Sequence, residues 1–145
     1  MKVRWLAVSL ACLFFCSACA HFSLKSPTEE SLRETVDKVW TSKTQRKWGP
    51  VYDQANEEYK AQVEREDFIR RSNLRVVSYS IREIRMTGPG KAAVTLGFTV
   101  NFTGTDFSGT AEEEWLWEKG EWRVNMMPQL NTPFGSLAKP PAPKK

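Results

Sequence analysis

The chain has 145 residues, enough for one domain with a single small core and short appendages. Its formal net charge is +4, but five of its 21 basic residues lie in the first few positions or in the proline-rich end, which leaves 16 against 17 acidic residues elsewhere. Nucleic-acid binding would need basic residues clustered on one face, and the sequence has no such cluster. All three cysteines lie between positions 12 and 19, which excludes disulfides and cysteine-ligated metals from the folded part.

Residues 1–18 have the layout of a targeting segment. A short basic start precedes an apolar run from Trp5 to Phe15, and the small residues Ser17 and Ala18 come directly before Cys19. The run is too short for a bilayer core of about 30 Å, which needs roughly 20 apolar residues. This pattern resembles the bacterial lipoprotein signal, although Cys16 stands where that signal usually has leucine. An ordinary secretory signal cut near Ala18 or Ala20 is the alternative.

The resemblance to a lipoprotein signal implies that Cys19 is lipid-modified and becomes the first residue of the mature chain. Several acyl chains would hold the protein on a membrane, since each buried methylene contributes about 0.8 kcal/mol. Ala20 follows Cys19 in place of aspartate, and in a Gram-negative host the family's sorting behaviour then favours the outer membrane, facing the periplasm. Residues 19–25 form a tether. It contains the only histidine, His21, which has no second metal ligand beside it.

Residues 26–44 are predicted to form the first helix. Ser26 is the expected N-cap, Pro27 takes the first helical position and Glu29 closes a capping box. The helix has one apolar stripe that we expect to lie across a sheet, made of Leu32, Val36, Val39 and Trp40. Gly49-Pro50 is expected to break it.

Residues 48–71 contain apolar residues at short intervals. A short helix is expected around Val51, Tyr52 and Ala55, followed by an irregular connection with Tyr59 and Val63. A second short helix is expected at Phe68-Ile69, because acidic residues lie toward its start.

The remainder predicts an antiparallel meander of four strands. Residues 74–86 form the first strand, with a β-bulge near Arg82-Glu83 where the apolar parity changes. Residues 94–103 alternate strictly, with their apolar residues on one face. Gly104-Thr105 predicts a type II′ turn that sets Phe102 opposite Phe107.

A second tight turn is predicted at Lys119-Gly120. Its register sets Trp117 opposite Trp122, Trp115 opposite Val124, and Glu113 opposite Met126. Both turns are consistent with a single apolar face. Residues 131–145 lack periodicity and are rich in proline and lysine, so we expect an extended tail.

The segments Trp48-x-x-Val51-Tyr52, Glu58-Tyr59-Lys60 and Glu66-Asp67-Phe68-Ile69-x-Arg71, followed by the meander, resemble the NTF2-like (cystatin-like) superfamily. The chain is similar to the NTF2-like domain at the N-terminal end of some low-affinity penicillin-binding transpeptidases. The resemblance covers roughly residues 28–127 and rests on packing motifs that carry no chemistry. It implies an α+β domain over residues 26–130, with an N-terminal helix and short helices packed on a curved, antiparallel four-stranded sheet that closes into a cone.

The sequence has no Ser/His/Asp set, Cys/His pair, metal-ligand spacing or glycine-rich phosphate loop, so no cofactor or metal is expected. Glu113 is the sharpest catalytic hypothesis. In the predicted register it faces an apolar wall, where burial would suit a carboxylate to general acid or base work. Alternatively, it lies at the open rim of the cone or pairs with Arg82 or Arg85.

Asp53 is the second catalytic candidate, because NTF2-like enzymes often place catalytic residues on the helical side of their pocket. Its neighbour Tyr52 either lines that pocket or is a core aromatic residue with its hydroxyl at the edge. Trp115, Trp117 and Trp122 belong to a large aromatic set that either lines a cavity for an apolar ligand or fills the core.

Three functions are therefore open. The first is a lipid-anchored envelope protein that binds an apolar or amphiphilic ligand, or a partner protein, without catalysis. The second is a small isomerase or hydratase that uses Glu113 or Asp53. The third is a structural accessory subunit of an envelope complex, which would present an apolar patch on the outer sheet face around Leu116 and Met127.

Overall fold

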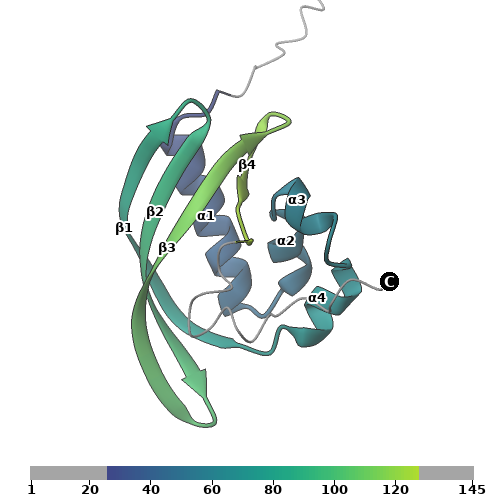
Figure 1. Cartoon of the computed structure of the whole chain (residues 1–145). Helices are drawn as coiled ribbons and strands as arrows, with labels where there is room; N and C mark the ends of the chain where they lie inside the picture. Colours follow the sequence, from purple (N-terminus) through teal and green to yellow (C-terminus); the bar gives the residue numbers. More distant parts are fainter. Residues whose placement is uncertain (1–25, 128–145) are drawn as a thin grey trace, which may run out of the picture.

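Helices pack on one face of a four-stranded antiparallel sheet, which confirms the α+β class (Figure 1). The computed structural model describes residues 26–127. The leader, the tether with Cys19 and His21, and the tail 131–145 lie outside these residues. The described elements are α1 (Glu29–Thr44), α2 (Trp48–Asp53), α3 (Glu57–Lys60), α4 (Arg65–Arg71), β1 (Arg75–Gly88), β2 (Lys91–Phe102), β3 (Thr105–Glu118) and β4 (Glu121–Val124).

The first helix begins later than predicted. Its N-cap is Thr28 and not Ser26, because the Thr28 side chain accepts a hydrogen bond from the Ser31 N–H at 3.2 Å. The Thr28 N–H donates back to Ser31 Oγ at 3.2 Å, which completes a capping box with serine where glutamate was expected. The apolar stripe of α1 is buried against the sheet as predicted. Within residues 26–127 no helix combines the length and apolar character needed to cross a membrane.

Residues directly after Thr44 end α1, so the prediction that Gly49-Pro50 breaks this helix is wrong. Arg46 takes a positive φ of 58°, and the N–H groups of Arg46 and Lys47 donate to the carbonyls of Lys43 and Ser42. This is a Schellman motif with arginine at the position that glycine usually holds. Gly49 and Pro50 instead belong to the first turn of α2, where proline removes a donor that has no partner in the helix. The expected irregular connection contains the one-turn helix α3.

The strands pair in chain order, so β1 and β4 are the two edges of the sheet. The register of β1 against β2 shifts at three places, between Val76 and Ser78, between Ile81 and Glu83, and between Met86 and Gly88. The middle shift is the predicted bulge, with Arg82 as the extra residue. The first shift leaves Val76 buried and Val77 exposed.

The two hairpins differ in how well the sequence predicted them. In the β3–β4 hairpin, Trp117 pairs with Trp122 and Trp115 with Val124, as expected. In the β2–β3 hairpin, Phe102 pairs with Thr105, so the turn residues are Thr103 and Gly104, one position before the predicted turn. Both have positive φ, 50° and 89°, which makes this a type I′ turn and not type II′.

The β4 edge is covered by the segment that follows α2. Val124 donates its N–H to the Gln54 carbonyl at 3.0 Å and accepts from the Asn56 N–H at 3.0 Å, which forms a parallel bridge at Ala55. Met126, expected opposite Glu113, lies beyond β4 and donates its N–H to Asn56 Oδ1 at 3.3 Å. The helices are thereby attached to the sheet along this edge.

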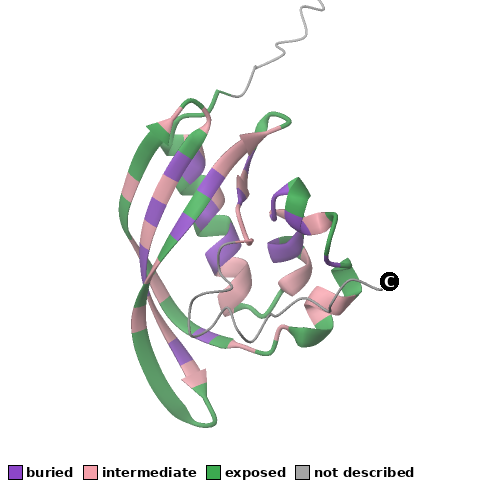
Figure 2. Ribbon diagram, viewed as in Figure 1, coloured by how far each residue is buried: buried purple, intermediate pink, exposed green. Residues whose placement is uncertain are grey.

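The core lies between α1 and the inner face of the sheet, and the inward positions of the strands are buried in Figure 2. A smaller cluster between the short helices contains Tyr52, Ala55, Tyr59 and Val63. The β2–β3 hairpin extends past the helices, and its end is exposed on both strands (Figures 1 and 2). The start of α1 lies at the opposite end of the domain (Figure 1).

Candidate functional site

Glu113 is buried beneath α1, as the register predicted, and only 3% of it is exposed. Its Oε1 accepts from Lys43 Nζ at 3.1 Å, and its Oε2 accepts from the indole N–H of Trp40 at 3.2 Å. Both partners come from α1, whereas Glu113 comes from the middle of β3. The buried carboxylate therefore joins helix and sheet, with each oxygen engaged.

Lys43 is the residue that the sequence analysis missed. Its side chain is 14% exposed, and its Nζ lies 3.9 Å from the centroid of the Trp40 ring, so it combines an ion pair with a cation–π contact. A signal for it was present, because Lys43 follows Val36 and Val39 on the apolar stripe of α1 at helical spacing. A lysine on such a stripe needs an anionic partner wherever its ammonium group is withdrawn from water.

The alternative partners expected for Glu113 lie elsewhere. Arg85 makes a 3.8 Å ion pair with Glu112, the outward-facing neighbour of Glu113. The Arg82 guanidinium lies beside Gly97, since a Cβ built on Gly97 would be 2.6 Å from Arg82 Nε. Neither arginine is therefore a partner of Glu113.

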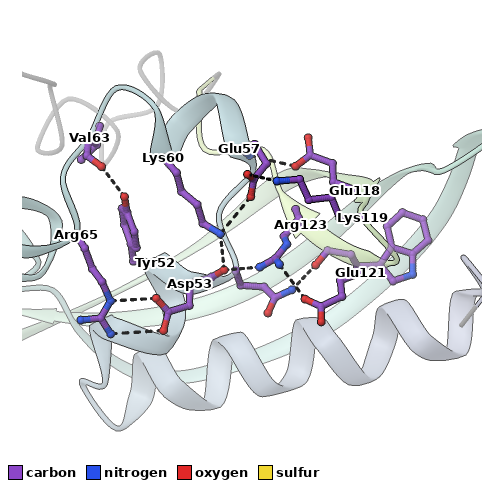
Figure 3. A network of polar contacts seen from close by, with 12 residues as sticks. Tyr52, Asp53, Glu57, Lys60, Val63, Arg65, Glu118, Lys119, Glu121 and Arg123 are labelled. Atoms are coloured by element: carbon purple, nitrogen blue, oxygen red, sulfur yellow. Dashed lines mark hydrogen bonds and ion pairs between the residues drawn. The ribbon is translucent and has the colours of Figure 1, made fainter.

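Asp53 lies at the end of α2 in a network of exposed polar contacts (Figure 3). Its carboxylate accepts from Arg65 Nε at 3.0 Å and from Arg65 Nη2 at 3.4 Å. Its main-chain carbonyl accepts from Lys60 Nζ at 2.8 Å and also from Arg123. Asp53 thus links α2 to α3, α4 and β4, and it lines neither of the two surface hollows described below.

The same network ties α3 to the β3–β4 turn. Lys119 Nζ donates to Glu57 Oε2 at 2.7 Å, and this contact is the main reason that the pKa of Glu57 is lowered. The Glu57 N–H donates to Glu118 Oε2 at 3.1 Å. These exposed contacts fasten the small helices to the edge of the sheet (Figure 3).

Tyr52 is buried, and its hydroxyl donates to the Val63 carbonyl at 2.6 Å. Burial raises the pKa of Tyr52, and the nearby carboxylates of Glu64 and Asp53 add to the effect. The ring packs 5.6 Å from Phe68 between centroids. Tyr52 therefore fills the smaller core cluster with its hydroxyl hydrogen-bonded, the arrangement expected of a core aromatic residue.

Trp115 and Trp122 have 0% and 1% exposure and belong to the main core. Trp117 is half-buried and meets Trp122 edge to face, with ring centroids 5.4 Å apart. The Trp122 indole N–H donates to Ser31 Oγ at 3.1 Å, next to the α1 cap. None of the three lines either of the two surface hollows described below.

The first hollow, here called the outer-face depression, lies on the sheet face turned away from the helices and measures about 410 Å³. Side chains of β1, β2 and β3 line it, chiefly Ser78, Ser80, Arg82, Thr99, Ser108 and Thr110. The sequence predicted no site on this face.

The second hollow is a groove of about 630 Å³ between α1 and β1. It contains Arg33, Asp37 and Tyr79, and the Tyr79 hydroxyl donates to Asp37 Oδ1 at 2.6 Å. Burial raises the pKa of Tyr79, and the hydrogen bond to Asp37 contributes in the same direction. In residues 26–127 no group of three His, Cys, Asp or Glu side chains is arranged to hold a metal ion.

No protein-family model and no curated protein sequence matches this chain. Among solved structures, the fold is similar to a SEC-C motif-containing protein from Rhodopseudomonas palustris, with a TM-score of 0.47 and 11% sequence identity. The match covers 69% of this chain and 77% of that protein. So loose a likeness supports no inference about function, which has to be argued from the chain itself.

Proposed function

We propose that this chain is a lipid-anchored bacterial envelope protein whose NTF2-like domain binds a ligand or a partner without catalysing a reaction. The burial and hydrogen bonding of Glu113 support a role without catalysis, because Glu113 is the carboxylate that the sequence favours most as a general acid or base. It is 3% exposed and gives one oxygen to Lys43 and the other to Trp40. A general acid or base must reach its substrate within hydrogen-bonding distance, and this geometry leaves no such approach.

The NTF2-like assignment is supported by the arrangement of the elements. A long first helix and three short ones lie on the same face of an antiparallel sheet, and bulges in β1 favour curvature of that sheet. Asp53, the other catalytic candidate, is held by Arg65 on the surface. The isomerase or hydratase alternative thus gains no observation in its favour.

The membrane anchor is supported by the leader, in which the small residues Ser17 and Ala18 come directly before Cys19. Cys19 precedes Ser26 by seven positions, and an extended chain of that length spans at most about 25 Å. Since α1 starts at the end opposite the β2–β3 hairpin, an anchored domain would turn that hairpin away from the membrane (Figure 1).

The exposed end of the β2–β3 hairpin favours binding of a partner protein. Phe102 and Phe107 are 55% and 49% exposed there, on strands that extend past the helices. Aromatic side chains exposed together on a small monomer often mark interaction sites. A photo-crosslinking amino acid placed at Phe102 should therefore capture a partner in the native host. The same probe at the exposed Lys119, in the β3–β4 turn, should not.

The anchor is tested by expressing the full-length chain in a Gram-negative host with labelled palmitate. The wild-type protein should be labelled and should sediment with membranes, and Cys19→Ser should lose both properties. Cys16→Ser is the matched control and should retain them. Undiminished labelling of Cys19→Ser would refute the anchor. Native mass spectrometry of the chain purified from its own host tests the ligand, since a bound apolar molecule would add a reproducible mass.

A further inference from the structure

The outer-face depression has a regular construction from three neighbouring strands. In one row Ser78 of β1 pairs with Thr99 of β2, which pairs with Ser108 of β3. In the next row Ser80 pairs with Gly97, which pairs with Thr110. Each row thus sets hydroxyl side chains on the face that the helices leave uncovered, and the second row has a glycine at its centre.

Gly97 leaves the room that makes this surface hollow. A Cβ at this position would lie 2.6 Å from Arg82 Nε, 2.9 Å from Arg82 Nη2 and 3.0 Å from Ser80 Oγ. Contacts under 3.0 Å essentially never occur for real Cβ atoms, so any other residue would displace the guanidinium. The absent side chain thus allows Arg82 to lie across the middle strand of the depression.

Arg82 reaches this place because it is the extra residue of the central β1 bulge. Bulges re-aim side chains, and they are over-represented near functional sites. Within residues 26–127 Arg82 has no ion-pair partner, whereas Arg85, three residues further along β1, pairs with Glu112. No acidic side chain lines the depression, so its one formal charge is positive.

The hydroxyl groups around Arg82 are largely available. Thr99 and Ser108 hydrogen-bond to each other at 2.9 Å. The side chains of Ser78, Ser80 and Thr110 have no hydrogen-bond partner in the described part of the chain. The depression therefore offers a planar cationic fork and three free hydroxyl groups in a volume of about 410 Å³, within the range of small-molecule sites.

We propose that the outer-face depression binds the carboxylate or phosphate group of a ligand that also carries hydroxyl groups, such as an acidic sugar. The guanidinium of Arg82 presents paired N–H donors in the geometry that carboxylates and phosphates accept, and the absent Cβ of Gly97 gives it room on this face. Ser78, Ser80 and Thr110 donate to, or accept from, the hydroxyl groups of the same ligand. The proposal extends the proposed function by naming a ligand class for a binding domain, and it involves neither the lipid anchor nor Glu113.

The test is a titration of the full chain, isotope-labelled and purified in detergent, followed by amide chemical shifts in NMR spectra. Three probes are compared at low salt: glucuronate, glucose 6-phosphate and neutral glucose. Saturable shifts centred on Ser80, Arg82, Gly97 and Thr110 are expected with one or both anionic sugars, and glucose should bind at least tenfold more weakly. Saturation by glucuronate alone identifies a carboxylate ligand, and saturation by glucose 6-phosphate alone identifies a phosphate ligand.

Two variants make the test specific. Arg82→Ala removes an exposed side chain and should weaken binding about tenfold or more, since it removes the charge-assisted hydrogen bonds to the anionic group. Arg85→Ala, the matched control on the same strand, should change the affinity less than twofold. Gly97→Ala should weaken binding as Arg82→Ala does, and its spectrum in the absence of ligand reports whether the sheet is intact.

Three results would overturn the site. They are saturable binding by none of the probes, equal affinity for glucose and the anionic sugars, and equal losses in Arg82→Ala and Arg85→Ala. Palmitate labelling of Cys19 is unaffected by any of these results. Failure of the anion site and failure of the proposed anchor can therefore be told apart.

Discussion

The pairing of Lys43 with Glu113 leads to a quantitative prediction about stability. Opposite charges 3.1 Å apart attract by about 5 kcal/mol at an effective dielectric constant of about 20. Desolvation of the two ions offsets much of this attraction, so the net contribution of the pair is small. Removing only one partner should lower the free energy of unfolding much more, because the other charge then remains buried without a partner.

The two single variants should differ in size. Lys43→Met strands a carboxylate that is 3% exposed, and we expect a loss of about 3–5 kcal/mol in the free energy of unfolding. Glu113→Gln should cost less, about 2–3 kcal/mol, since Lys43 is 14% exposed and its ammonium group can turn toward water. Glutamine can still accept the hydrogen bond from Trp40.

The double variant isolates the interaction. Lys43→Met with Glu113→Gln leaves no charge behind, and we expect it to cost less than the sum of the single variants by about 2 kcal/mol or more. Urea unfolding at pH 7, followed by far-UV circular dichroism, measures all three. Lys38→Met, at an exposed position of the same helix, is the control and should lie within about 0.5 kcal/mol of wild type. A coupling energy below about 0.5 kcal/mol would refute the reasoning.

Three further predictions concern separate features. Thr103→Asn should raise stability by about 0.5–1 kcal/mol in urea unfolding, because a β-branched residue now has a φ of 50° in the type I′ turn; an unchanged midpoint would contradict this. Thr28→Ala should cost about 1 kcal/mol through loss of the α1 cap, whereas Ser26→Ala should have no effect. Because the pKa of Tyr52 is raised by folding, the unfolded chain loses its proton first, so stability should fall as the pH rises past about 10. Tyr52→Phe should reduce that alkaline loss while costing about 1 kcal/mol at pH 7, and identical pH profiles would rule this out.

Features set by periodicity could be predicted from the sequence. The apolar stripe of α1 and the alternation along β2 identified the core-facing residues, and the parity change in β1 located the bulge at Arg82. The Lys119-Gly120 turn gave a correct register because Gly120 occupies a position with a φ of 82°. The burial of Glu113 followed from the same register.

Features set by local competition or by contacts between distant segments could not be predicted. The β2–β3 turn has threonine where a positive φ is required, so the position of Gly104 alone misplaced it by one residue. The ion pair of Glu113 joins residues 70 positions apart, and the choice of Lys43 over Arg82 depends on which face of the sheet each side chain occupies. The outer-face depression likewise depends on Gly97 meeting Arg82 across two strands.

The three interruptions in β1 have a consequence for how copies of this protein meet one another. An exposed strand edge is a template for pairing with another chain, and β1 is both long and at the edge of the sheet. Because extra residues fall at Val77, Arg82 and Thr87, no regular stretch of β1 exceeds four residues. A second strand could not stay in register along this edge, so the bulges discourage edge-to-edge aggregation. Such protection would matter most where many copies of the chain are crowded together.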